Sequence, residues 1–267
     1  MTRYHIIGIN NSSVHTYKFL KKQGYKTTIS DQKKLKYIKT KIKLKNINKD
    51  FFFENHPKKI LESANQIIFS TGVIKNLNDY KSYHKKKKNI SQIDLFNKFN
   101  KWPTSKILIV TGSRGKTTLC RSIFKQLKKN KVFRKIIYVD RKKMTFSNIP
   151  KYKKNSFLIA EVDYQLLAIS KKIKSKYRII TSFFFNENKA FKSKELYLKA
   201  KLKIFNDLKL KDFVLADYLT FKKLKKNIKI DKKKIILVKN SNSIEKTNNK
   251  LTSMIVETIK KNLNEKY

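Results

Sequence analysis

The chain has 267 residues, of which 40% are apolar, so it is long enough to bury one large core or two ordinary ones. Its 66 lysines and arginines against 18 aspartates and glutamates give a formal net charge of +48, which at first suggests a nucleic-acid or anionic-surface partner. The lysines are spread along the whole chain, however, and heavy use of asparagine and isoleucine beside them fits A+T-rich coding bias better.

Cysteine usage and hydropathy exclude further classes. Cys120 is the only cysteine of the chain, which excludes an internal disulfide framework and fits a reducing compartment. No apolar run approaches the roughly 18 residues of a membrane span, and the opening residues lack the apolar core of a signal peptide. We therefore expect a cytoplasmic protein without a membrane span.

Residues 1–100 alternate between short apolar runs and helical spacing. Val14, Tyr17 and Leu20 recur with the period of a helix, and Gly24 suits the position just after a helix end. This alternation of strand and helix predicts a parallel sheet. The predicted strands are residues 4–9, 26–30, 51–53 and 66–72, and the predicted helices are residues 14–23, 58–64 and 91–100.

The pair Trp102-Pro103 marks a boundary, after which the alternation resumes. The later strands are continuous apolar runs, which predicts a doubly wound, mostly parallel sheet buried on both faces. We expect one domain at residues 1–100 and a second at residues 104–267. The predicted strands of the second are residues 106–110, 135–140, 157–162, 177–185, 212–217 and 234–238, and its closing helix is residues 244–263.

The stretch KILIVTGSRGKTTLCRSI, residues 106–123, predicts a phosphate-binding loop. A strand that ends in glycine and opens a helix presents backbone N–H groups at the positive end of the helix dipole. Gly112 and Gly115 would let the backbone approach phosphate oxygens, Lys116 would neutralise them, and the Thr117 hydroxyl would hold Mg²⁺. The spacing is shorter than the usual G-x-x-x-x-G-K-[ST], because Val110 stands where the first glycine would be.

The short loop form, with its Thr-Gly-Ser-x-Gly-Lys-Thr-Thr pattern, resembles the central domain of the Mur ligases. Three further landmarks follow in the family's order: SNIP at residues 147–150, AEVDYQL at 160–166 and YLKAKLKIF at 197–205. In the N-terminal region, the opening IIGINNSSVHTYKFLKKQGYKTTISD, FSTGV at residues 69–73 and the helical IDLFNKF are similar to the branch of the family that adds D-glutamate.

The resemblance implies a fold and an activity. The fold is α/β, with a Rossmann-like N-terminal domain that binds a UDP-linked precursor, followed by a doubly wound, P-loop-containing ATP domain. The activity is that of an ATP- and Mg²⁺-dependent carbon–nitrogen ligase of peptidoglycan biosynthesis, which adds D-glutamate to UDP-N-acetylmuramoyl-L-alanine. A substrate carboxylate is phosphorylated to an acyl phosphate, and an amine then attacks it.

The resemblance also assigns roles to individual residues. Lys116 is implied to act in catalysis, and Glu161 would join Thr117 at the metal. Lys201 matches the lysine that the family carbamylates, which turns a cation into a metal-binding or hydrogen-bonding carboxylate. The implied ATP contacts are Gly112, Ser113, Arg114, Gly115, Lys116, Thr117 and Thr118. The implied substrate contacts are Gly8, Asp31, Thr71, Gly72 and Asn148.

The chain departs from the family pattern at several points: Asn10 and Ser13 replace glycines of the N-terminal loop, Thr71 replaces the proline of Ser-Pro-Gly, and two further departures bear on catalysis. The family's catalytic histidine position is best matched by Asn188, whose amide can hydrogen-bond but cannot titrate. A third, C-terminal domain, which binds the incoming amino acid in the family, is expected to be absent. The four histidines have no metal-ligand spacing and are expected to have no catalytic role.

Several functional hypotheses therefore stand side by side. The chain is a partner-dependent ligase whose missing domain is supplied by a separate chain, or a degenerate relative that binds nucleotide without catalysis. A second ligase hypothesis is a poly-γ-glutamate-synthase-like enzyme, which shares Arg114 in its loop pattern but leaves the N-terminal domain unexplained. The non-enzymatic hypothesis is a basic nucleotide-binding module for nucleic acid or an anionic surface, with nucleic acid the less expected partner.

Overall fold

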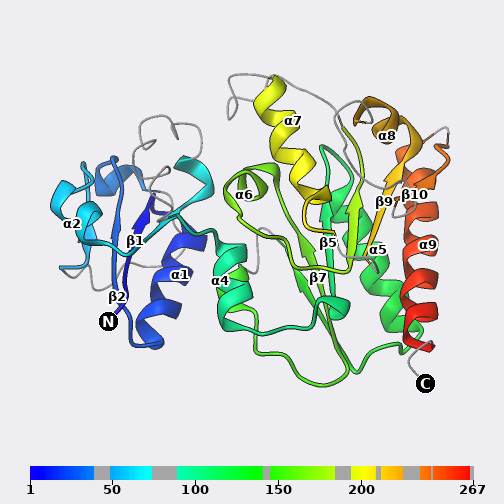
Figure 1. The fold of residues 1–267 in the computed structure, drawn as a ribbon, viewed down its shortest axis with the longest axis horizontal. Helices are drawn as coiled ribbons and strands as arrows, with labels where there is room; N and C mark the ends of the chain where they lie inside the picture. The colour runs from blue at the N-terminus through cyan, green and yellow to red at the C-terminus, as the bar shows by residue number, and fades with distance from the viewer. Residues whose placement is uncertain are drawn as a thin grey trace. The chain divides into compact units, whose positions relative to one another are not determined.

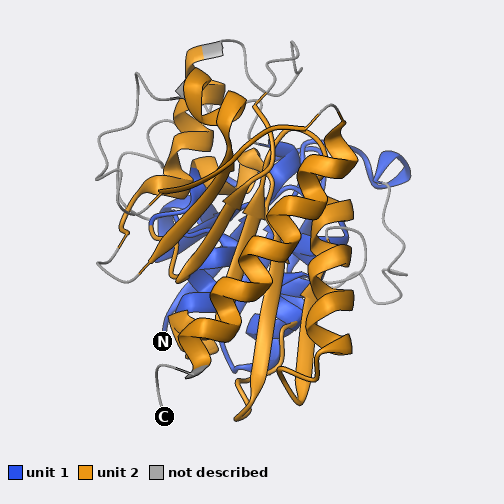
Figure 2. Ribbon diagram, turned by 90° about the vertical axis from the view of Figure 1, so that its right-hand side faces the viewer, with its two compact units in different colours: residues 1–98, 145–148, 169–171 blue, residues 99–144, 149–168, 172–267 orange. Residues whose placement is uncertain are grey.

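Two compact units make up the computed structural model of the chain, and Figure 2 colours them separately. Unit 1 comprises residues 1–98, 145–148 and 169–171, and unit 2 comprises residues 99–144, 149–168 and 172–267. The structure describes residues 1–38, 49–73, 89–140, 145–183, 194–208, 212–224, 235–241 and 243–264.

Unit 1 is built on a four-stranded parallel sheet with the strand order β3-β2-β1-β4. The strands are β1 (Arg3–Ile7), β2 (Lys26–Ser30), β3 (Phe51–Phe52) and β4 (Gln66–Phe69). The helical segments are α1 (Asn11–Lys22), η1 (Leu35–Tyr37), α2 (Lys58–Ser63), α4 (Gln92–Phe99) and η4 (Phe146–Asn148).

The ends of α1 follow from local chemistry. The Asn10 side chain accepts from the Ser13 N–H, and the Ser13 hydroxyl accepts from the Asn10 N–H, which forms a capping box. Beyond the other end, Gly24 has a φ of +82°, the left-handed conformation that favours glycine. The two ends hold α1 in place between β1 and β2, to which it connects.

Unit 2 is built on a six-stranded parallel sheet with the order β10-β9-β8-β5-β7-β6 (Figure 1). The strands are β5 (Ile107–Thr111), β6 (Lys135–Val139), β7 (Ser156–Glu161), β8 (Tyr177–Ile180), β9 (Phe213–Asp217) and β10 (Ile235–Val238). The helical segments are η3 (Thr104–Lys106), α5 (Lys116–Lys129), α6 (Tyr164–Ile169), α7 (Lys194–Leu202), η5 (Lys203–Phe205), α8 (Tyr218–Leu224) and α9 (Ile244–Asn264).

Both faces of the central strands in unit 2 are buried. Alternate residues such as Leu108 and Val110 share a core with α5 and α9, which pack side by side on one face (Figure 1). The intervening Ile109 is equally buried and points to the opposite face. The continuous apolar strands are therefore explained by a sheet covered on both sides.

The parallel register brings three strand ends together in unit 2. Val110 of β5 lies opposite Glu161 of β7, and Thr111 lies opposite Ile180 of β8. The segments that leave these three strands therefore start at neighbouring points of the same sheet edge. This edge carries the candidate site.

The predicted α/β fold with parallel sheets is confirmed. The predicted strand at residues 177–185 is shorter in the structure, where β8 ends at Ile180 and polar Thr181 and Ser182 follow. Among the described residues, no helix is long and apolar enough to cross a membrane.

A buried histidine stabilises the sheet of unit 1 through hydroxyl groups. His5 of β1 is fully buried, and its Nδ1 lies 2.7 Å from Thr28 Oγ1 and its Nε2 lies 2.8 Å from Ser30 Oγ. Ser30 Oγ in turn lies 2.6 Å from His56 Nδ1. Burial, together with the neighbouring His56, lowers the pKa of His5 to about 3.

The low pKa of His5 predicts a loss of stability in acid. Between an unfolded pKa of ~6.5 and the folded pKa of about 3, the unfolded state binds a proton that the folded state does not. The contribution of His5 is complete above pH ~6.5 and falls as the pH is lowered, by up to ~1.4 kcal/mol per pH unit. Hydrogen exchange of the β1 amides between pH 5 and 8 measures this slope after correction for intrinsic rates.

His5→Gln should flatten that slope, whereas His15→Gln, on the less buried surface of α1, serves as the matched histidine control and should change it less. An unchanged slope in folded His5→Gln would contradict the assignment of the acid sensitivity to His5.

Candidate functional site

A four-residue loop joins β5 to α5, and its two glycines cannot be replaced without strain. Gly112 and Gly115 have φ values of +149° and +81°. A Cβ on Gly112 would lie 2.0 Å from Thr181 Oγ1, and a Cβ on Gly115 would lie 2.9 Å from Asn248 Nδ2. The loop therefore needs glycine both for its conformation and for its close packing against neighbouring segments.

The residues that follow β8 hold this loop. The Ser113 N–H donates to Ser182 O at 3.0 Å, and the Arg114 N–H donates to Ser182 Oγ at 2.9 Å. The Thr181 hydroxyl donates to Arg114 O at 2.5 Å, and the Thr181 N–H donates to Thr111 O at 2.9 Å. Hydrogen bonds thus fix the loop to the residues that follow β8.

The first turn of α5 faces the same edge of the sheet. The first N–H groups of any α-helix have no acceptor within the helix, and the helix dipole makes that end positive. Among the described residues, no side chain caps the start of α5 at Gly115. Lys116 folds back so that its Nζ donates to Gly112 O at 2.8 Å. An anion at this end of α5 would meet backbone donors and an ammonium group together.

Glu161, the last residue of β7, lies beside the first turn of α5. Thr117 Oγ1 donates to Glu161 Oε2 at 2.8 Å, and the Tyr138 hydroxyl lies 3.5 Å from the same oxygen. A hydroxyl and a carboxylate are hard oxygen ligands of the kind Mg²⁺ prefers. The described residues contain no cluster of three or more acidic, histidine or cysteine side chains suited to a metal. The pair fits a Mg²⁺ that takes its remaining ligands from water and substrate phosphates.

Lys201 of α7 reaches the same loop from another direction. It is fully buried, and its Nζ donates to Ser113 Oγ at 3.0 Å. Ser113 Oγ also lies 2.9 Å from the Tyr197 hydroxyl, and the Lys201 ammonium lies 5.0 Å from the centre of the Tyr197 ring. Burial, and next the charge of Lys116, lower the pKa of Lys201 to about 7. The uncharged form of this amine is therefore favoured more than in an exposed lysine.

A cavity of about 230 Å³ opens beside the loop within unit 2. Arg114 lines it from the loop, Phe183 from the segment after β8, Asp217 from the end of β9, and Asn248 from α9. Asn240 Nδ2 donates to Asp217 Oδ1 at 2.9 Å, which fixes that carboxylate at the rim. Most of the residues that line the cavity are polar or charged, and Phe183, Leu219 and Ile244 are the apolar ones.

Unit 1 contains a separate cavity of about 490 Å³ at the carboxyl ends of its strands. Gly8, Asp31 and Gly72 all line it. The Asp31 carboxylate accepts from the Ile9 N–H at 2.7 Å and from the Lys33 N–H at 2.9 Å. Gly8 has a φ of +91°, and a Cβ there would lie 2.2 Å from Ser70 Oγ. His56 lines the cavity as well, so the buried histidine chain ends at its wall.

The remaining predicted substrate and catalytic residues fall elsewhere. Thr71 is not among the residues that line the unit 1 cavity, although its neighbour Gly72 is. Asn148 ends η4, where Ser147 Oγ lies 2.6 Å from Thr16 Oγ1 of α1, and it does not line that cavity. Asn188 lies outside the described residues.

Sequence reasoning missed Thr181, Ser182 and Tyr197 as parts of the loop site. A signal for the first two was available, because polar residues directly follow an apolar strand at the carboxyl edge of a parallel sheet. Tyr197 opens the lysine-containing helical motif, but only the fold shows that its hydroxyl meets Ser113.

The sequence and the fold are similar to those of known ligases. No family profile matches the chain. The chain is 23% identical over 207 residues to UDP-N-acetylmuramoylalanine–D-glutamate ligase of Caldicellulosiruptor saccharolyticus. These aligned residues make up 76% of this chain and 45% of that enzyme. The chain thus spans less than half the length of this curated relative.

Solved structures of ligases also match the chain. The UDP-N-acetylmuramate:L-alanyl-gamma-D-glutamyl-meso-diaminopimelate ligase of Neisseria meningitides matches with a TM-score of 0.51 and 13% identity, over 90% of this chain and 78% of that one. The UDP-N-acetylmuramate-alanine ligase of Thermotoga maritima matches with a TM-score of 0.46 and 18% identity, over 81% of this chain and 49% of that one. The chain thus shares its fold with the first of these structures and is distantly similar in sequence to the curated ligase, so it resembles the Mur ligases.

Proposed function

We propose that the chain binds Mg²⁺-ATP at residues 112–118 and supports ATP-dependent amide-bond formation on a UDP-linked muramoyl substrate. The observation that carries the proposal is the convergence of two contacts on the glycine loop and the first turn of α5. Thr117 of α5 donates to Glu161, and Ser113 of the loop accepts from Lys201. Three separate elements thus supply a cation, a metal-ligand pair and a buried amine around the positive end of α5.

The triphosphate would lie along the loop and the first turn of α5. Its oxygens would accept from the backbone N–H groups there, and Lys116 Nζ would leave Gly112 O for a phosphate oxygen. The adjoining cavity of about 230 Å³ would receive the base and sugar. Thr117 and Glu161 would hold Mg²⁺, which supplies charge neutralisation of the phosphates when bound.

The proposed chemistry has two steps. A carboxylate oxygen of the muramoyl-linked substrate attacks the γ-phosphorus, and the bond from that phosphorus to ADP breaks. The amine of the incoming amino acid, D-glutamate by the sequence similarity, then attacks the acyl carbon, and phosphate leaves. Lys116 would stabilise the charge on the transferred group, because its ammonium lies at the loop that holds it.

The environment of Lys201 supports its carbamylation. Reaction with CO₂ needs an uncharged amine, and the pKa of about 7 provides one near neutral pH. The carbamate would exchange a buried cation for an anion near Lys116, the neighbouring charge that helps to lower the pKa of Lys201. The added carboxylate would be held by hydrogen bonds or face the metal.

The cavity of unit 1 is the proposed site for the uridine diphosphate of the substrate. Gly8 lets the backbone approach closely at a strand end, and Asp31 stands at the end of β2, where an acidic residue can accept from a ribose hydroxyl. The incoming amino acid would be bound by a third domain, on this protein or on a separate chain, as the length of the curated relative suggests.

Lys116→Ala should weaken the binding of Mg²⁺-ATP by about 10- to 100-fold, the loss expected when a charge-assisted hydrogen bond to phosphate is removed. Isothermal titration calorimetry measures it. Lys125→Ala is the matched control, because Lys125 is an exposed lysine of the same helix. Equal binding by Lys116→Ala and wild type, or binding by neither, would refute the loop as a nucleotide site.

Addition of UDP-N-acetylmuramoyl-L-alanine and D-glutamate should cause ADP formation, either by the chain alone or with a chain that carries the third domain. Lys201→Ala should reduce kcat about 100-fold or more, because it removes the buried amine next to the loop. Lys199→Ala, an exposed lysine of the same α7, should leave kcat unchanged. The assay couples ADP to an optical signal and detects the amide product by mass spectrometry.

If no mixture gives ADP formation dependent on the muramoyl substrate, the ligase proposal fails, and nucleotide binding without catalysis is the alternative that remains.

A further inference from the structure

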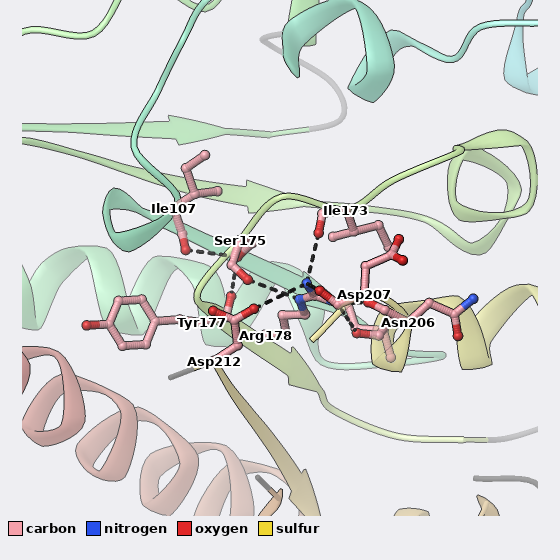
Figure 3. A network of polar contacts seen from close by, with 9 residues as sticks. Ile107, Ile173, Ser175, Tyr177, Arg178, Asn206, Asp207 and Asp212 are labelled. Carbon is pink, nitrogen blue, oxygen red and sulfur yellow. Dashed lines mark hydrogen bonds and ion pairs between the residues drawn. The ribbon is translucent and has the colours of Figure 1, made fainter. Parts of the chain in front are cut away.

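Arg178 is a buried cation in the middle of β8, and the proposed chemistry does not use it. Its side chain is only 1% exposed, and Figure 3 shows the guanidinium among backbone carbonyl groups of two segments, residues 173–175 and 204–207. Asp212 Oδ2 lies 3.9 Å from Arg178 Nη2 and provides an opposite charge. The acceptors are Ser175 O at 3.1 Å from Nε, Ile204 O at 2.9 Å and Asn206 O from Nη1, and Ile173 O at 2.8 Å and Asp207 O at 3.5 Å from Nη2.

A cation is costly to bury, so this arrangement requires compensation. Burial lowers the pKa of Arg178 to about 10, against the raising effects of Asp212 and Asp207. Arginine suits the position because its planar guanidinium has five N–H donors in a fixed fork, whereas lysine has a single ammonium group. Backbone carbonyl oxygens thus accept the hydrogen bonds that the guanidinium would otherwise donate to water.

Three of these carbonyls belong to the end of the segment that carries Lys201. Helix α7 continues into η5, and Ile204, Asn206 and Asp207 follow Lys201 within two turns. A positive group at the carbonyl end of a helical segment also has a favourable interaction with its dipole. Arg178 therefore fastens this end of the segment to β8 (Figure 3).

The same strand fastens the loop. Thr181 and Ser182, which follow β8 directly, bind the backbone of Ser113 and Arg114. One four-residue strand is thus connected at its middle to the lysine segment and at its end to the loop. The 3.0 Å contact between Lys201 Nζ and Ser113 Oγ joins two parts that are both attached to β8.

We propose that Arg178 is a positioning residue that sets the place of the Lys201 amine at the loop by fixing the α7–η5 segment to β8. Only the role of Lys201 in the reaction depends on the proposed function. The placement of the amine itself can be measured without nucleotide, substrate or turnover.

The test measures the titration of the Lys201 amine in the full chain. Brief acylation with acetic anhydride over a pH series, followed by mass spectrometry of the Lys201 peptide, gives the midpoint of its reactivity. Two titratable side chains have described interactions with this amine, Lys116 from α5 and Tyr197 from α7. The midpoint should be about 7 in the wild type. In Arg178→Met it should rise by about one pH unit or more towards the ~10.4 of an exposed lysine, because the released amine gains water.

Two further variants separate positioning from general loss of stability. Ile259→Ala creates a cavity in the core between α9 and the sheet, on the face of the sheet opposite Arg178. This variant should leave the Lys201 midpoint at its wild-type value. Arg178→Lys keeps a cation that cannot reach all the carbonyls, and should give a smaller upward shift. If circular dichroism shows that Arg178→Met does not fold, the midpoint measured in Arg178→Lys tests the positioning role instead.

An unshifted midpoint in whichever Arg178 variant folds would overturn the proposal, as would an equal shift in Ile259→Ala. A shift confined to the Arg178 variants would support it. If ATP binding fails in the wild type while this shift is observed, the proposed function falls and the positioning role stands.

Discussion

The candidate site depends on the parallel register of β5, β7 and β8. Because Val110 faces Glu161 and Thr111 faces Ile180, the glycine loop, the acidic strand end and the Thr181-Ser182 pair leave the sheet as neighbours. A shift of one residue in this pairing would turn each side chain to the other face and separate Thr117 from Glu161. The apolar burial of both sheet faces fixes the register, so the core of unit 2 is also what positions its polar edge.

Electrostatics gives this edge its chemical character. Lys116 and Lys201 both donate hydrogen bonds to the same loop. Lys116 donates to Gly112 O, and Lys201 donates to Ser113 Oγ. Burial of Lys201, and next its repulsion from Lys116, lower the pKa of that amine, and an anion bound between the two lysines would relieve the repulsion. A bound phosphate, or the conversion of one lysine to an anion, would therefore lower the electrostatic cost of placing two ammonium groups at this loop.

Much of the fold was predictable because its strands are continuous apolar runs with clear helical spacing between them. The loop that contains Gly112 and Gly115 could also be predicted, because a strand, a glycine turn and a helix start follow one another directly in the sequence. Arg178 was not, because one basic residue among 66 carries no signal until its burial is known. Lys201 likewise stood out only through the family resemblance. The His5–Ser30–His56 chain joins residues distant in sequence, which only the pairing of β1 with β2 brings together.

We propose that residues 112–118 form a nucleotide-binding loop, with Thr117 and Glu161 as metal ligands and the buried Lys201 amine beside it. A crystal structure of the full chain with Mg²⁺ and a non-hydrolysable ATP analogue tests it most directly. We expect the triphosphate along the loop, Lys116 Nζ on a phosphate oxygen instead of Gly112 O, and the metal next to Thr117 and Glu161. A nucleotide bound at a different place on the chain, or none bound at saturating concentration, would contradict it.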